Sequence, residues 1–213
     1  MISIYFFKIQ KKHHQRLEYF LSRVPILTKN TLQKYHRKED QLRGVIARLI
    51  LKKLLIERGF SENVLSHIKI DEFDRPFIEG NVDFNIAHSG TYVICAVSEK
   101  SRIGVDIEKI KKIKMDDFNV FLAKDELKKI KASKTPENIF FTLWTQKEAV
   151  SKANGKGLGV LLPDIKIKKG NAVCKKQKWN LLKLDIGKKY HSYLAFKGKQ
   201  AVELKELKLA ELG

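Results

Sequence analysis

The fold is decided by the stretch Ile103-Gly104-Val105-Asp106-Ile107-Glu108. Apolar residues alternate there with Gly104, Asp106 and Glu108, which is the two-residue period of a β-strand. We therefore predict a strand whose apolar side packs inward and whose other side carries both carboxylates. Carboxylates at positions i and i+2 of a strand repel each other, and a hard divalent cation relieves that repulsion by taking their oxygens as ligands. Taken alone, the pattern also fits an exposed polar strand face.

A helix is expected over residues 136–154, because apolar residues recur through this range at helical spacing. Thr135 suits the N-cap of this helix, and Pro136 suits its first position. Gly155 is well placed to end it.

Three residues of this helix, Trp144, Glu148 and Lys152, are spaced four apart and therefore share one face. A Glu and a Lys at this spacing often form an ordinary surface ion pair. A carboxylate beside a bulky aromatic on a partly buried face, however, is costly unless a cation or a function keeps it there. We predict that Glu148 joins Asp106 and Glu108 to complete a Mg²⁺ site, with Lys152 facing a phosphate held by the metal.

The rest of the chain alternates between helical and extended patterns. The predicted elements are a first strand over 1–9, a long helix over 37–58, strands over 68–107, a shorter helix over 118–130 and Lys-rich strands after 163. Helices followed by antiparallel strands in each half predict an α+β fold made of two similar lobes.

The composition is strongly basic. With 43 Lys and Arg against 24 Asp and Glu, the formal net charge is +19, which favours anionic partners. Only 8 of the basic residues are Arg, which disfavours base-specific nucleic-acid recognition because dedicated readers rely on Arg. The two cysteines lack a metal-binding spacing, and we find neither a targeting segment nor an apolar run long enough to span a membrane. We therefore expect a soluble, cytoplasmic protein.

Five sequence blocks occur together in one order. They are R-K-E-D-x-x-R (37–43), D-R-P (74–76), F-N-I-A-H-S-G (84–90), G-V-D-I-E (104–108) and F-x-x-L-W-T-x-K-E-A-x-x-K-A-x-G-K-G-L (140–158). A lone D-x-E carries no information, but the five blocks in order resemble the 4′-phosphopantetheinyl transferases of the larger, surfactin-synthetase-activating type.

The resemblance implies transfer of the phosphopantetheine arm of coenzyme A to a serine of an acyl or peptidyl carrier protein, with release of 3′,5′-ADP. The metal would be Mg²⁺, with Mn²⁺ as an alternative. The implied fold is a pseudo-dimer of two lobes, each a long helix on a small antiparallel sheet, with the active site in the cleft between them. The expected division is 1–104 for the coenzyme A-binding lobe and 105–213 for the lobe with the metal site and catalytic helix. A monomer without nucleic-acid or membrane partners is expected.

The same resemblance implies catalytic roles for Asp106, Glu148 and Lys152. Asp106, Glu108 and Glu148 would hold the metal. Glu148 would also take the serine proton, directly or through a water molecule, and Lys152 would stabilise charge on the pyrophosphate of coenzyme A.

Four further residues are expected, from the resemblance, to contact coenzyme A. His88 and Ser89 would contact its phosphates, and Arg43 would contact the nucleotide. Arg75 would lie near the adenosine 3′-phosphate or the adenine. Lysines and threonines within 28–34 are additional candidates that the sequence does not separate.

Two other functional classes compete with this interpretation. A basic phosphate- or nucleic-acid-binding module would explain the charge, but an acidic trio would repel a nucleic-acid backbone. Another Mg²⁺-dependent phosphoryl-transfer enzyme or nuclease would use the same carboxylates, although no P-loop, kinase or H-E-x-x-H motif supports one. Carrier proteins are typically acidic, so we interpret the Lys excess over 109–134 and 166–189 as a docking and steering field.

Overall fold

The computed structural model describes residues 1–114, 118 and 120–212. Contacts divide the chain into two compact units. Unit 1 comprises Met1–Asp71, Pro76–Lys100 and Gln200–Gly213, and unit 2 comprises Glu72–Arg75 and Ser101–Lys199. These units differ from the division into 1–104 and 105–213 in three places. The C-terminal segment from Gln200 groups with unit 1, whereas residues 72–75 and 101–104 group with unit 2.

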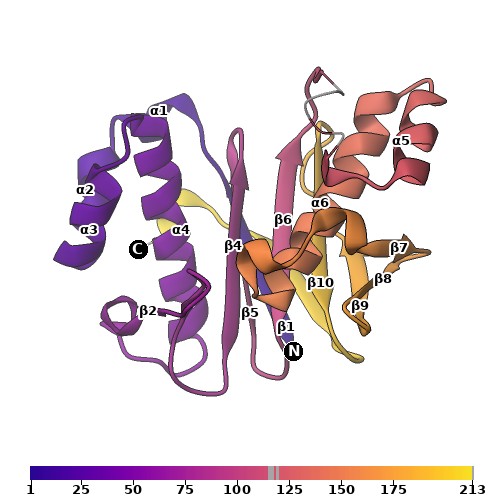
Figure 1. Cartoon of the computed structure of the whole chain (residues 1–213). Coiled ribbons are helices and arrows are strands. Elements are labelled where there is room, and N and C mark those ends of the chain that lie inside the picture. The colour runs from indigo at the N-terminus through magenta and orange to yellow at the C-terminus, as the bar shows by residue number, and fades with distance from the viewer. Residues whose placement is uncertain (115–117, 119, 213) are drawn as a thin grey trace. The chain divides into compact units, whose positions relative to one another are not determined.

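Unit 1 is a four-stranded sheet covered by a long helix (Figure 1). The strands lie in the order β11-β1-β5-β4, and α4 packs on β5. Their bounds are Ile2–Lys8 for β1, Asp83–Ser89 for β4, Tyr92–Ser98 for β5, Val202–Glu206 for β11 and Lys38–Ile56 for α4. The β1–β5 and β4–β5 pairs are antiparallel as expected, whereas β11 runs parallel to β1. The expected antiparallel sheet is therefore mixed at this edge.

Shorter elements complete unit 1. They are α1 Lys11–His14, α2 Leu17–Leu21, α3 Ile26–Gln33, η1 Val64–His67, β2 Lys69–Ile70, β3 Pro76–Phe77 and η5 Leu209–Leu212. Gly44 of α4 lets α3 pack closely, because a Cβ there would overlap the end of the Leu32 side chain. Leu32 is accordingly buried in the unit 1 core.

Unit 2 is an antiparallel sheet in the order β6-β10-β9-β8-β7, covered by α6. The bounds are Ile103–Lys109 for β6, Lys166–Lys168 for β7, Asn171–Cys174 for β8, Gln177–Lys183 for β9, Tyr190–Phe196 for β10 and Pro136–Asn154 for α6. The remaining elements are α5 Lys124–Lys131, η3 Gly157–Gly159 and η4 Leu162–Asp164. The helix expected over 118–130 is therefore shorter and begins at 124, and position 119 of that prediction lies outside the described residues.

The two units share one order of elements, which confirms the α+β class. Unit 1 runs β1-α4-β4-β5 and unit 2 runs β6-α6-β9-β10. In unit 1, β5 pairs antiparallel with both β1 and β4. In unit 2, β10 pairs in the same way with β6 and β9. Both long helices have 19 residues. The likeness of the two halves is thus one of topology, without a sequence repeat.

Candidate active site

The candidate site of unit 2 begins where β6 meets α6, and Gly104 permits this approach. A Cβ at Gly104 would overlap the Ala149 carbonyl oxygen and the Ala153 nitrogen, and would lie 3.0 Å from the Ala153 Cα. Asp106 has the same parity on the strand as Gly104. The strand face that carries the carboxylates therefore faces α6, and Asp106 is only 5% exposed.

An ion pair joins the two elements. Lys152 Nζ of α6 lies 2.6 Å from Asp106 Oδ1 and also donates to the Val105 carbonyl at 3.4 Å. Ser192 Oγ of β10 donates to the Asp106 backbone carbonyl at 2.8 Å, which fixes β6 on its other flank. Asp106 Oδ2 is buried and has no hydrogen-bond partner among the described residues.

Glu148 belongs to the same electrostatic group. Burial raises the pKa of Glu148, and the Asp106 and Glu108 carboxylates raise it further against the opposing effect of Lys152. Burial by itself lowers the pKa of Lys152, but attraction to Asp106, Glu148 and Glu108 outweighs this and leaves that pKa raised. The four residues predicted in this lobe, three carboxylates and one lysine, therefore lie within electrostatic range of one another.

The donor chemistry of this group fits a hard divalent cation, since carboxylate oxygens are its preferred ligands. The buried, unpartnered Asp106 Oδ2 is the observation that fits a metal. Within residues 1–114, 118 and 120–212, no three His, Cys, Asp or Glu side chains are arranged as a ready-made metal cluster. The metal ligand set of Asp106, Glu108 and Glu148 stays a prediction.

A second, fully buried lysine lies beside Glu148 in the sequence. Lys147 Nζ lies 2.7 Å from Glu126 Oε2 of α5 and donates to the Leu162 carbonyl at 2.8 Å. Burial lowers the pKa of Lys147, and Glu126 opposes that change. Glu126 also accepts from the Ala123 amide at 2.8 Å. Sequence analysis missed this network, although a lysine interrupting an apolar helical stripe could have indicated it.

The residues predicted to contact coenzyme A from unit 1 form their own group. Arg43 of α4 donates to the Gly90 carbonyl at 3.0 Å, directly after His88 and Ser89 at the end of β4. Arg43 also pairs with Asp40 at 2.5 Å, and its hydrogen bond lowers the pKa of Asp40, with His88 adding a smaller effect. His88 is exposed and Ser89 is half-buried. The structure thus joins the R-K-E-D-x-x-R and H-S-G blocks.

Arg75 of the D-R-P block lies in unit 2 and is 7% exposed. Its guanidinium donates to the backbone carbonyls of Lys152 and Ile103. The predicted contact of Arg75 with the cofactor stays a prediction.

Comparisons with known proteins match both halves of the chain. The model of the "4'-phosphopantetheinyl transferase superfamily" matches residues 102–202, and that of "4'-phosphopantetheinyl transferase, N-terminal" matches residues 11–100. The 4'-phosphopantetheinyl transferase gsp of Aneurinibacillus migulanus is 32% identical over 163 residues, 74% of this chain and 68% of the relative. The chain belongs to the 4′-phosphopantetheinyl transferase superfamily. This confirms the family that the five sequence blocks resemble.

The comparisons also gave a second curated relative and one solved structure. The 4'-phosphopantetheinyl transferase Sfp of Bacillus subtilis is 29% identical over 71% of this chain and 69% of its own length. The crystal structure of Thermotoga maritima holo-[acyl-carrier-protein] synthase is 18% identical, with a TM-score of 0.38 over 46% of this chain and 63% of that chain. In this chain, no helix among the described residues is both long enough and apolar enough to cross a bilayer.

Proposed function

We propose that this transferase moves the 4′-phosphopantetheine arm of coenzyme A to a serine of an acyl or peptidyl carrier protein and releases 3′,5′-ADP. The observation that carries the proposal is the Asp106–Lys152 ion pair with Glu148 beside it. These residues belong to the blocks at 104–108 and 140–158, both of which lie within the range that the superfamily model matches. An acidic trio around one lysine suits a pyrophosphate substrate, which needs a metal and a cation to neutralise its charge.

The transfer reaction requires one general base and one cationic side chain from this protein. The serine oxygen attacks the phosphorus that carries the pantetheine, a new P–O bond forms, and the bond to the bridging oxygen breaks as 3′,5′-ADP leaves. Glu148 takes the serine proton, and its raised pKa favours that role because a base works best when its pKa approaches the working pH. Lys152 stabilises the charge that develops on the pyrophosphate oxygens.

Asp106, Glu108 and Glu148 would hold Mg²⁺, or Mn²⁺ in its place. When bound, the cation neutralises pyrophosphate charge and orients the reacting phosphate. In the chain itself, Lys152 offsets part of the repulsion among these carboxylates through its ion pair with Asp106.

The unit 1 group would bind the nucleotide part of coenzyme A. Arg43 supplies a fixed cation, His88 an exposed ring and Ser89 a hydroxyl, all beside the turn at Gly90. Arg43 Nε is buried without a hydrogen-bond partner among the described residues.

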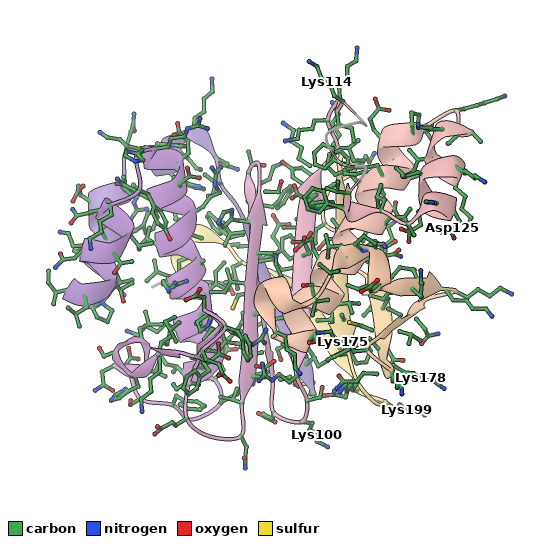
Figure 2. The ribbon with its side chains drawn as sticks, viewed as in Figure 1. Lys100, Lys114, Asp125, Lys175, Lys178 and Lys199 are labelled. Atoms are coloured by element: carbon green, nitrogen blue, oxygen red, sulfur yellow. The ribbon has the colours of Figure 1, made fainter. Side chains whose placement is uncertain are left out.

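The carrier protein would be acidic and would meet the exposed lysines of unit 2. Lys175 and Lys176 form the β8–β9 turn, and Lys178 and Lys199 extend outward from the same end of this sheet (Figure 2). A field of this sign speeds the association of an acidic partner and weakens as salt is added. We also propose that the reaction takes place in the cytoplasm and that the chain acts as a monomer.

Release of 3′,5′-ADP tests the residue roles. The protein is incubated with coenzyme A, Mg²⁺ and an apo carrier, and the nucleotide is separated by chromatography. We expect release by the wild type, loss in E148Q by roughly 100-fold or more, and loss with EDTA. The matched control is E137Q, the same substitution at the start of the same helix, which should keep full activity. Equal activity of E148Q and E137Q would refute the assignment of Glu148.

A further inference from the structure

Arg75 is a buried cation of unit 2 that donates hydrogen bonds to the backbone of this unit. Its Nη1 donates to the Lys152 carbonyl, and its Nη2 donates to the Ile103 carbonyl at 3.0 Å. Lys152 is in the last turn of α6, and Ile103 is the first residue of β6. The Arg75 side chain therefore joins the end of α6 to the start of β6. These two elements carry Lys152 and Asp106, which form the ion pair.

The end of α6 needs such a donor. The last carbonyls of a helix have no intrahelical amide partner, and a cation is favourable there because it opposes the helix dipole. Gly155 ends the helix in the left-handed conformation at φ 74°, so the chain turns away after Asn154. Arg75 donates a hydrogen bond to one of these last carbonyls, that of Lys152. A guanidinium is a rigid fork that reaches two acceptors at once, whereas a lysine ammonium is a single point charge.

The local sequence directs Arg75 toward this position. Asp74 adopts a left-handed backbone at φ 60°, which Asp tolerates better than most residues. Pro76 restricts the preceding residue to extended conformations. The carbonyl of Phe73 approaches Gly157 so closely that a Cβ there would lie 3.3 Å from it. Glu72–Arg75 is therefore packed as a part of unit 2, far in sequence from the rest of that unit.

We infer that Arg75 is a positioning residue: by holding the carbonyls of Ile103 and Lys152, it keeps the Lys152 side chain on Asp106. This role would replace the contact with the 3′-phosphate of coenzyme A that the resemblance implies for Arg75, because its guanidinium donates to the chain's own backbone. The kinetic consequences rest on the proposed function, whereas the local structural consequence does not.

Three variants test the inference. R75M removes the charge, R75K keeps the charge but cannot bridge both carbonyls, and R102M is the control that removes an exposed arginine close to the same glycine turn at Gly155. Amide hydrogen exchange is measured over residues 151–156. Steady-state kinetics are measured with coenzyme A and with dephospho-coenzyme A, which lacks the 3′-phosphate.

We expect faster exchange over 151–156 in both Arg75 variants, by about tenfold or more, with R102M unchanged. We expect kcat to fall roughly 10- to 100-fold in R75M and R75K alike, with KM for coenzyme A little changed and both substrates affected by the same factor.

A phosphate-binding arginine would behave differently: R75K would retain activity, and R75M would raise KM for coenzyme A only. That pattern, or unchanged exchange in R75M, would overturn the inference. If the wild type transfers nothing, the proposed function fails, and the exchange result alone then decides whether Arg75 holds the end of α6.

Discussion

Replacing Gly104 by alanine should separate β6 from α6. The added Cβ would overlap backbone atoms of Ala149 and Ala153 and would lie 3.0 Å from the Ala153 Cα, whereas carbon atoms pack at about 3.5–4.0 Å. The obstacle is helix backbone, which cannot rotate aside as a side chain can. The strand must therefore move away by roughly 1 Å or more, and the Lys152–Asp106 contact of 2.6 Å must lengthen.

Overpacking a core costs typically 1–3 kcal/mol, and a clash with backbone belongs at the upper end, so we expect G104A to lose about 3 kcal/mol. For a chain of this size the melting temperature should fall by roughly 6–12 °C. Thermal and urea unfolding followed by circular dichroism measure the loss. G159A is the matched control, because a Cβ at Gly159 meets only the Lys156 Cβ at 3.8 Å. If G104A were as stable as G159A, the close approach of strand and helix would be refuted.

Three further predictions concern the charges of unit 2. E148Q should melt roughly 2–4 °C above the wild type at pH 8, because a carboxyl whose pKa is raised in the folded state opposes folding once it is ionised. The gain in melting temperature should vanish below the ordinary Glu pKa of 4.5. A gain at every pH in a series of thermal scans would contradict this. K147M should lose about 3 kcal/mol of unfolding free energy in urea, because Glu126 is left buried without its cationic partner. The double variant E126L/K147M should recover most of this loss. Equal stability of the single and double variants would refute the pairing. Raising salt from about 50 to 500 mM should raise KM for an acidic carrier several-fold and leave kcat unchanged, and a salt-independent KM would exclude electrostatic docking.

The sequence predicts those parts of the molecule that depend on local rules. Pro136 and Gly155 determine the ends of α6 through their own backbone preferences, and the helix has the predicted bounds. The parity of β6 places Asp106 and Glu108 on one face, and the four-residue spacing places Glu148 and Lys152 on one helix face. Contact of that strand with that helix then places all four within electrostatic range of one another.

The features that sequence analysis missed arise from contacts between distant segments. The parallel pairing of β11 with β1 joins the two ends of the chain, and no local pattern specifies it. The packing of Glu72–Arg75 within unit 2 has the same character. The partner of Lys147 lies on another helix, so the sequence shows an unexpected lysine in an apolar stripe but not the Glu126 that pairs with it.

Transfer itself is tested most directly by the intact mass of the carrier. An apo carrier is incubated with this protein, coenzyme A and Mg²⁺, and its mass is measured beside that of a carrier whose acceptor serine is replaced by alanine. The account predicts the addition of one phosphopantetheine to the serine carrier and none to the alanine carrier. Several apo carriers left unmodified by the folded protein would contradict it.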